Sequence, residues 1–309
     1  MLDQVVTAEQ ALDAVLDAED PPSTALKELF ARPSSARVTD ALRGGYDNFQ
    51  ADRDLCEQLA KADPLLPHAA RALQRHAVKA SEWAAGRGIV QYLDLGCGLP
   101  YPGIDRRLRN STPALHAYAV LAGADPARVR ITYVDTDPVV ISHANALLDD
   151  GPAVRVLRAD LLDMQTLLTA EKVNGHLDSS LPIAVSLNAV LHWITDDDAV
   201  HHALDQLTAW LAPGSAVSLT HAASDYNPAV AAHRDATSCE AGLPLRSRSR
   251  DEVGRLLTGL DLYPPGLADV TDWWNDDATG PLGVWAALGI KPGPRPDRTS
   301  AGPLRADAR

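Results

Sequence analysis

Two aspartates and two glycines occupy positions where the chain could hold a ligand. Asp94 lies near the end of an apolar run over residues 89–95, and Gly96 and Gly98 follow directly. An apolar run that stops at closely spaced glycines is typical of a buried strand entering a tight turn. Glycine adopts backbone angles that other residues avoid, and it has no side chain to hold a ligand away. The stretch therefore predicts a ligand site at a strand end, where open α/β sheets bind their ligands.

The spacing of these glycines separates two classes of ligand. A dinucleotide site needs a third glycine three positions after the second, where this chain has Tyr101. S-adenosylmethionine (SAM) has no pyrophosphate, and its ribose diol suits a carboxylate at the end of the next strand. A second apolar strand, residues 129–134, runs directly into Asp135. We therefore favour SAM over a nicotinamide cofactor, the alternative being an ordinary strand–turn–helix corner without a ligand.

Composition and charge narrow the class of protein. The 309 residues carry a net charge of −13, which repels phosphate backbones and anionic lipids, so we expect neither a nucleic-acid nor a membrane partner. The three cysteines lie far apart and form no C-x-x-C pair, so neither a disulfide framework nor a metal site is expected. The sequence shows no signal-peptide pattern and no apolar run of membrane-spanning length, which predicts a cytoplasmic protein.

The elements that would position these residues alternate between helix and strand. Short apolar runs of strand length recur over residues 129–134, 154–157, 182–187 and 216–220. Helical patterns are expected over residues 65–87, from the cap Asp137-Pro138, over 197–211, and from a capping box at 249–252. Residues 260–270 and 283–290 should pair at the sheet edge, and residues 222–247 look like a polar loop with a short helix. This alternation predicts an α/β fold with helices on both faces of a mostly parallel sheet.

A segment before the first strand adds a more specific pattern. It contains Ala36-Arg37-Val38, Asp40, the pair Gly44-Gly45, Asn48-Phe49 and then Asp52-Arg53. Together with residues 95–100, 134–138 and 190–192, this pattern resembles an actinobacterial S-adenosyl methyltransferase family long described as a domain of unknown function. The resemblance covers residues 33–290. It implies a Rossmann-like class I methyltransferase fold, with a mostly parallel seven-stranded sheet, an N-terminal helical extension and SAM as cofactor.

The expected cofactor-binding residues lie at strand ends and in the N-terminal segment. They are Asp94, Gly96, Gly98, Asp135, Thr136, Asp160, Leu161, Asn188, Arg37, Asn48 and Phe49. Asp160 would either meet the adenine amine or cap the following short helix. Arg37 would either meet the methionine carboxylate of SAM or hold the glycine turn together with Asp40. Asn188 is expected nearer the methionine end.

Two residues are candidates for catalysis. Methyl transfer from a sulfonium is an in-line displacement, so the protein mainly supplies alignment and excludes water. A general base is needed only when the nucleophile carries a proton. His192 follows the fourth strand and titrates near neutrality, so it is the candidate base, the alternative being a hydrogen-bonded histidine in the strand–helix corner. Tyr46 is the second candidate, and its turn would either cover SAM or brace the N-terminal helices.

The expected organisation is an N-terminal helical segment and lid over residues 1–64, a SAM-binding methyltransferase domain over 65–290, and a disordered tail over 291–309. An arm of a homodimer and a brace are alternatives for the first segment. Residues 101–112 look inserted, and would shape substrate choice or pad the surface. The predicted function is methyl transfer from SAM to an O, N or C atom of a small molecule, for example in specialised metabolism. An enzyme that transfers or cyclises another part of SAM and a non-catalytic SAM-binding protein are the alternatives.

Overall fold

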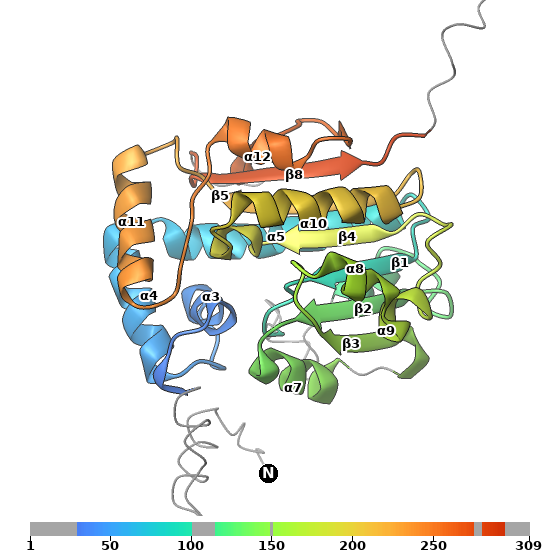
Figure 1. The fold of residues 1–309 in the computed structure, drawn as a ribbon, viewed down its shortest axis with the longest axis horizontal. Helices are drawn as coiled ribbons and strands as arrows, with labels where there is room; N and C mark the ends of the chain where they lie inside the picture. The colour runs from blue at the N-terminus through green and yellow to red at the C-terminus, as the bar shows by residue number, and fades with distance from the viewer. Residues whose placement is uncertain (1–29, 101–114, 149–150, 275–279, 294–309) are drawn as a thin grey trace, which may run out of the picture.

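A single mixed sheet forms the centre of the molecule (Figure 1). The computed structural model describes residues 30–100, 115–148, 151–274 and 280–293. The strands run in the order β3-β2-β1-β4-β5-β8-β6, with β7 also paired to β8. Their bounds are β1 Gln91–Leu95, β2 Arg130–Asp135, β3 Val154–Arg158, β4 Ala184–Asn188, β5 Ala216–Ala222, β6 Asp261–Leu262, β7 Ala268–Asp269 and β8 Val284–Ile290. Strands β1 to β5 are parallel and β8 is antiparallel to β5, which confirms the predicted fold class.

The sheet has eight strands where the family resemblance implies seven, because its edge strand is divided. β6 pairs with one end of β8 and β7 pairs with the other, both antiparallel. Pro264 and Pro265 lie between them and have no N–H group to donate to a ladder. The expected pairing of residues 260–270 with 283–290 is therefore confirmed, and the difference in strand number comes from the two prolines.

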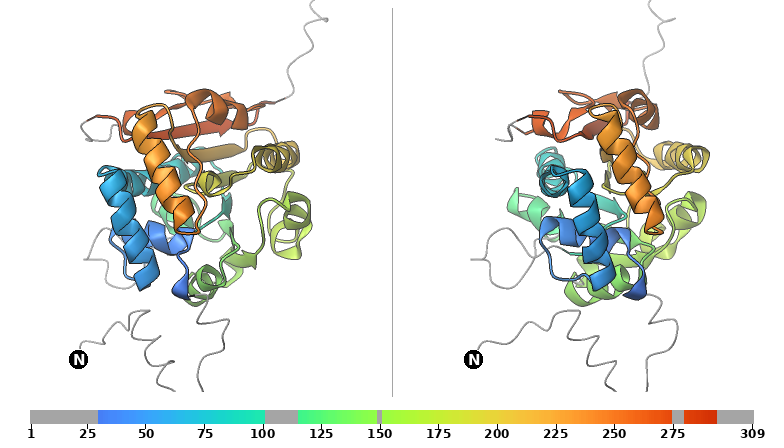
Figure 2. Two further views of the ribbon diagram at one scale, coloured as in Figure 1. Left: turned by 60° about the vertical axis from the view of Figure 1, so that its left-hand side comes forward. Right: turned by 90° about the vertical axis from the view of Figure 1, so that its left-hand side faces the viewer.

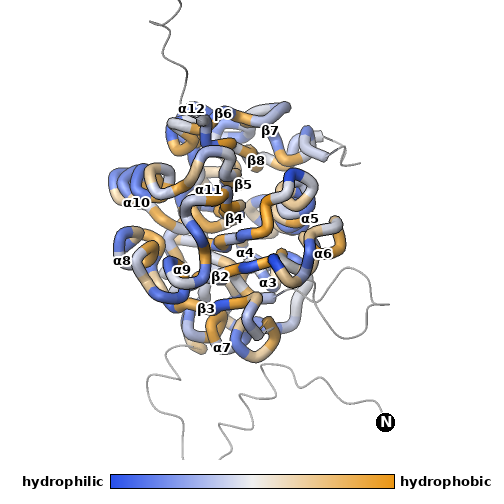
Figure 3. The backbone as a smooth tube through the Cα atoms, turned by 90° about the vertical axis from the view of Figure 1, so that its right-hand side faces the viewer, coloured by the Kyte–Doolittle hydropathy of each residue, from blue (hydrophilic) through white to orange (hydrophobic). Residues whose placement is uncertain are grey.

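Helices cover both faces of this sheet, as predicted. One face carries α5 (Leu66–Ala85), α6 (Leu115–Leu121) and α7 (Pro138–Leu147), and the other carries α8 (Met164–Thr169), α9 (Glu171–Asn174), α10 (Asp197–Trp210) and α12 (Arg250–Leu256). Short 3₁₀ helices are η1 (Gly151–Ala153), η2 (Leu191–Trp193) and η3 (Val270–Asp272). Hydrophobic residues follow the strands, and hydrophilic residues mark the outer turns of α8 and α10 (Figure 3). Each face therefore buries its own apolar core against the sheet.

Three further helices gather beyond the carboxyl end of β4, to which the arrow of that strand points in Figure 1. They are α3 (Ser35–Arg43), α4 (Gln50–Ala62) and α11 (Pro228–Glu240). α4 packs along α11 (Figure 2), and α3 packs against both α4 and α5. An apolar cluster of Val38, Leu42, Leu55, Leu59 and Ala70 joins α3, α4 and α5. The described part of the N-terminal segment is therefore packed onto the main body.

Local capping signals placed several helices correctly. Asp137 caps α7 by accepting a hydrogen bond from the Val139 N–H at 2.8 Å, and Ser249 and Glu252 form the capping box of α12. Helix α11 is longer than expected from the sequence: it has 13 residues, where only a short helix was expected. The helices expected within residues 1–29, the insertion at 101–112 and the tail from residue 294 lie outside the described residues. Within the described residues, no helix combines the length and the apolar character needed to span a bilayer.

Candidate functional site

The turn after β1 is tight and open on one side. Gly96 and Gly98 have φ values of 69° and 64°, in the left-handed region that favours glycine. The N–H groups of Gly96 and Cys97 both donate to the Val134 carbonyl, at 2.8 and 3.0 Å. A Cβ atom on Gly96 would overlap the Val190 side chain, whereas one on Gly98 would meet no atom within 4 Å. Gly96 therefore allows a close approach within the protein, and Gly98 leaves its backbone exposed to a ligand.

A cleft of about 480 Å³ lies over this turn, at the carboxyl ends of β1 to β4. That volume is in the range of ~300–1,000 Å³ typical of small-molecule sites. The predicted residues that line it are Gly96, Gly98, Asp135, Thr136, Asp160, Leu161 and Asn188. Asp94 lines a smaller adjoining cavity of about 100 Å³, which shares the glycine turn and Asn188 with the cleft. The fold thus brings eight predicted residues together.

Asp135 stands where a carboxylate could hold a diol. Its Oδ2 accepts from the Gly98 N–H at 3.0 Å and its Oδ1 from the Asp137 N–H at 2.9 Å, which fixes the carboxylate at the rim of the cleft. Burial raises the pKa of Asp135. Each carboxylate oxygen has a second lone-pair site, so both can still accept a hydroxyl donor from a ligand.

Asp94 is the most perturbed carboxyl group of the site. It is only 8% exposed, and burial raises its pKa to about 7. The Ser186 hydroxyl and Arg43 act in the opposite direction, and Asp135 raises the pKa further. A buried carboxyl with so little compensation favours a cation placed beside it, because the cation would stabilise its charged form.

Hydroxyl groups of β4 and β5 fix the chain at the end of β4. Asn188 Nδ2 donates to the Ser186 and Ser218 hydroxyls at 3.0 and 3.1 Å. The Ala189 N–H donates to the Thr220 hydroxyl at 2.9 Å. Ala189 itself has a φ of 59°, which is uncommon for a residue with a Cβ and occurs more often at functional sites. Both Asn188 and Ala189 line the cleft in this fixed conformation.

Asp160 closes a local turn and does not cap the following helix, which was one of its two expected roles. Its Oδ1 accepts from the Leu162 N–H at 2.9 Å, which closes a local turn. The N-cap of α8 is Asp163 and not Asp160. Asp160 is exposed and lines the cleft beside Leu161.

The N-terminal segment contributes a helix face that the sequence analysis missed. Ser35, Ala36, Thr39 and Arg43 of α3 all line the cleft, and Arg43 also lines the smaller cavity next to Asp94. The signal was present in the sequence. Ser34 is an N-cap, Gly44 is a left-handed C-cap with a φ of 85°, and positions 35, 39 and 43 recur every four residues along one helix face.

The N-terminal residues predicted to contact the cofactor lie behind that face and do not line the cleft. Arg37 is buried, pairs with Asp52 at 2.8 Å and lies 3.6 Å from Asp137 at the start of α7. The Asn48 amide donates to Asp40 at 2.8 Å, and the Phe49 ring packs at the start of α4, 5.2 Å from the Arg37 guanidinium. These side chains tie α3 to α4 and α7.

Tyr46 and His192 also lie away from the cleft. Tyr46 is 66% exposed in the turn between α3 and α4. His192 is buried in η2 and lines a separate inner cavity, with its ring centroid 5.5 Å from that of His221. Burial, followed by His221, Arg234 and Arg248, lowers the pKa of His192 well below 6.5, so the ring is neutral near neutral pH. The residues that the structure describes include no group of three His, Cys, Asp or Glu side chains placed to hold a metal ion.

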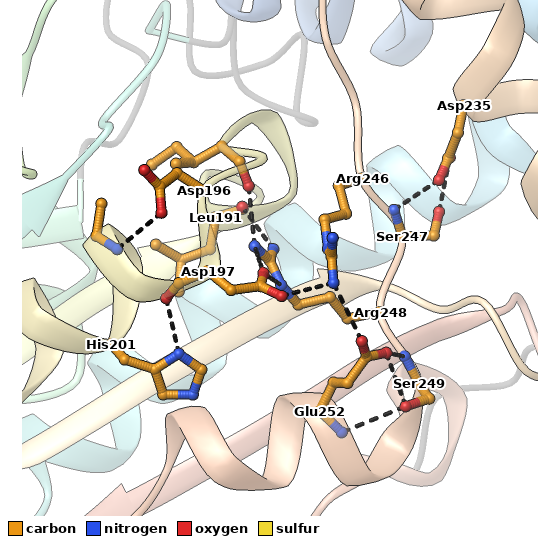
Figure 4. Close-up of polar contacts among 12 residues, drawn as sticks. Leu191, Asp196, Asp197, His201, Asp235, Arg246, Ser247, Arg248, Ser249 and Glu252 are labelled. Carbon is orange, nitrogen blue, oxygen red and sulfur yellow. Dashed lines mark hydrogen bonds and ion pairs between the residues drawn. The ribbon is translucent and has the colours of Figure 1, made fainter.

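An arginine from a distant part of the chain holds the loop that carries His192 (Figure 4). Buried Arg248 donates to the Leu191 and Ile194 carbonyls at 3.0 and 2.9 Å and to the Asp197 carboxylate at 2.6 Å. Arg246 forms a second ion pair with the Asp197 carboxylate. Because residues 193–196 line the cleft, this network fixes one of its walls.

Comparisons with known proteins agree with this geometry. A family model described as S-adenosyl methyltransferase matches residues 24–292. A crystal structure from Thermobifida fusca YX, provisionally assigned as a methyltransferase, aligns at 29% identity with a TM-score of 0.76, covering 88% of this chain and all of that one. A protein of the family DUF574 from Streptomyces avermitilis MA-4680 aligns at 28% identity with a TM-score of 0.76, covering 85% of this chain and 99% of its own. No curated protein gives a significant match.

The residues present also fit the cofactor that this family uses. The open Gly98 backbone, the Asp135 carboxylate and the buried Asp94 beside Arg43 offer partners for an adenosine and an amino acid in the cleft and in the smaller cavity that adjoins it. The chain belongs to the S-adenosyl methyltransferase family, and it is a SAM-dependent methyltransferase.

Proposed function

We propose that the chain transfers the methyl group of SAM to a small molecule, with the cofactor lying along the cleft and the acceptor beyond its methionine end. The single observation that carries the proposal is that the cleft and the smaller cavity adjoin at the glycine turn, and that together they bring Asp160, Asp135, Gly98 and Asp94 to one edge of the sheet. When bound, SAM supplies a sulfonium methyl group to a nucleophile aligned with the breaking bond. The enzyme's own contribution is to hold the two reactants in line and to exclude water.

The adenosine end is assigned to the ends of β2 and β3. Asp135 is proposed to accept both ribose hydroxyl groups, since its two oxygens are fixed by the Gly98 and Asp137 N–H groups. Asp160 is proposed to accept the adenine amine, with Leu161 supporting the ring. Thr136 lines the same end of the cleft.

The methionine end is assigned to Asp94, Arg43 and Asn188. Asp94 is proposed to bind the ammonium group, because a nearby cation would relieve the cost of burying its charge. Arg43, which lines both cavities, is proposed to bind the carboxylate in the role expected of Arg37. Arg37, Asn48 and Phe49 are then positioning residues, since their contacts hold α3 in place. The Asn188 side chain is held at this end by its two hydroxyl partners.

The acceptor is proposed to be a small molecule with an O, N or C nucleophile. The cleft volume of about 480 Å³ accommodates a cofactor with a modest acceptor beside it. The net charge of −13 argues against a nucleic-acid acceptor, because a phosphate backbone would be repelled.

Calorimetry with S-adenosylhomocysteine (SAH), the demethylated cofactor, tests the cofactor assignment. Asp135→Ala removes the two proposed ribose contacts, which should cost about 1.5–3 kcal/mol of binding free energy. Asp163→Ala is the matched control, because Asp163 caps α8 and does not line the cleft. Equal SAH affinity of wild type and Asp135→Ala would remove Asp135 from the site. Mass spectrometry of candidate acceptors incubated with SAM then identifies the methylated product.

A further inference from the structure

One end of the cofactor cleft borders the inner cavity. Thr39 of α3, Ala189 after β4 and Trp193 of η2 line both spaces. The inner cavity lies at the carboxyl ends of β4 and β5, with Ala222 among its lining residues. Because the strands follow the order β3-β2-β1-β4-β5, these three shared residues mark the end of the cleft that is farthest from β3.

Two residues that follow α11 complete this end. Leu243 and Pro244 line the cleft, and the next residue, Leu245, lines the inner cavity. Leu243 also packs against the apolar cluster that joins α3, α4 and α5. Leu243 and Pro244 therefore form, together with Thr39, Ala189 and Trp193, the β4 end of the cleft.

The proposed cofactor partners lie elsewhere. Asp135 and Asp160 follow β2 and β3, and Asp94 and Arg43 line the smaller cavity next to β1. Asp196 is the remaining charged residue among the described residues that line the cleft, and it caps α10, which packs against α8, the helix after β3. Past the methionine partners, the strand order therefore leads to the β4 end of the cleft, whose five residues carry no charge.

The apolar side chains of the β4 end define the shape that it would accept. Trp193 contributes an indole ring, and Leu243 and Pro244 contribute aliphatic carbon, all of them accessible in part to solvent. A flat ring packs favourably against an indole ring, beyond the apolar area that it buries. A charged group placed here would lose its hydration without gaining a counter-charge. The β4 end therefore favours a flat molecule without charge.

Thr39 adds a hydrogen-bond acceptor to this apolar wall. Its hydroxyl donates to the Ser35 carbonyl at 2.7 Å, one turn earlier in α3. Since a hydroxyl has a single proton, the Thr39 oxygen has only lone pairs left for a ligand. It can accept from an O–H or N–H group, and it has no proton left to donate to a carboxylate. Thr39 thus matches a ligand that carries a hydroxyl or an amine.

We propose that the β4 end of the cleft binds the methyl acceptor, which is an uncharged, flat aromatic molecule whose hydroxyl or amine group donates to Thr39. This proposal rests on the proposed function, because the cofactor must lie in the same cleft. The oxygen or nitrogen of the acceptor forms a bond to the methyl carbon while the bond between sulfur and that carbon breaks. SAH is the leaving group, and the proton of the hydroxyl or amine passes to solvent.

Calorimetry with three probes on the SAH-saturated protein tests this substrate class before any substrate is known. 2-Naphthol is flat and uncharged and carries a hydroxyl. Decahydro-2-naphthol keeps the hydroxyl without the flat rings, and 2-naphthoate keeps the rings but replaces the hydroxyl by a charged group. 2-Naphthol should bind more tightly than either of the others. No binding of 2-naphthol, or equal binding of one of the other two, would overturn the proposal.

A matched pair of threonine variants shows where the probe binds. Thr237 of α11 donates to the His233 carbonyl at 2.8 Å, the same bond within a helix that Thr39 makes, and it does not line the cleft. Thr39→Val should weaken 2-naphthol binding by about 2- to 10-fold, the effect of one lost hydrogen bond, and Thr237→Val should not change it. SAH affinity should stay the same in both variants.

The possible failures are distinguishable. Wild-type affinity of Thr39→Val for 2-naphthol, or a loss of SAH affinity in Thr39→Val and not in Thr237→Val, would contradict the position proposed for the acceptor. Failure of the wild type to bind SAH would instead refute the proposed function.

Discussion

Replacement of Asp94 by asparagine should stabilise the protein while weakening its cofactor binding. Asp94 is 8% exposed, and its pKa rises from an ordinary value of 3.8 to about 7, chiefly because burial disfavours its charge. Asparagine has nearly the same shape and no charge. The substitution therefore removes the electrostatic cost of this carboxylate and also removes the proposed partner of the SAM ammonium group.

The magnitude follows from the pKa shift. Between pH 3.8 and about 7 the folded state binds a proton that the unfolded state has released, so the free energy of unfolding falls as pH rises and levels off above 7. One pKa unit corresponds to ~1.36 kcal/mol, so the two units between pH 5 and 7 amount to about 3 kcal/mol. Asp94→Asn has no such proton to lose. Its stability relative to wild type should therefore increase by about 3 kcal/mol between pH 5 and 8.

Urea unfolding of wild type and Asp94→Asn at pH 5 and at pH 8 measures this change in relative stability. Any difference in stability between the two proteins that is the same at both pH values cancels in the comparison. Asp198→Asn controls for the loss of one surface charge. SAH calorimetry supplies the second half of the test. The affinity of the wild type should increase as pH rises toward 7, since the ionised carboxylate binds the ammonium, and Asp94→Asn should bind more weakly without this rise. A stability difference that does not change with pH would refute the reasoning.

Three other changes have expected outcomes. Arg43→Gln should weaken SAH binding by about 1.5–3 kcal/mol in calorimetry, through the lost charge-assisted hydrogen bonds, and unchanged affinity would exclude Arg43 from the site. Gly98→Ala and the control Gly123→Ala should each cost about 1–2 kcal/mol in urea unfolding, because both glycines have positive φ and open surroundings. Only Gly98→Ala should also weaken SAH binding, and an equal loss in both variants would contradict the proposed close approach. Arg248→Lys should speed hydrogen exchange of residues 191–194 while the exchange of β1 stays slow, and unchanged exchange would show that Arg248 does not hold this loop.

Local signals in the sequence predict most of the fold. The cap at Asp137 and the capping box at residues 249–252 lie within single helix ends, so short-range chemistry suffices to place them. The edge strand is different, because the sequence pattern spans residues 260–270 while two prolines divide the actual pairing into β6 and β7. Helix α3 went unrecognised, since its buried face carries the charged Arg37, and its partners Asp52 and Asp137 lie far along the chain.

The candidate site was predictable where it follows strand ends and not where it depends on packing. Asp94, Asp135 and Asn188 follow from the rule that parallel strands present their carboxyl ends at one edge. His192 also follows a strand, but its surroundings are built by α3, α4, α5 and the segment around Arg234. No spacing within the sequence reveals that these helices enclose His192 in an inner cavity separate from the cleft.

A crystal structure of the protein with bound SAH is the most direct test of the central claim. The account predicts that the ribose hydroxyls of SAH donate to Asp135, that its carboxylate meets Arg43, and that its ammonium lies beside Asp94. The β4 end of the cleft, beside Thr39 and Leu243, should remain free of SAH. SAH bound without contact to Asp135, or with its methionine end at the β4 end of the cleft, would contradict both the cofactor assignment and the position proposed for the acceptor.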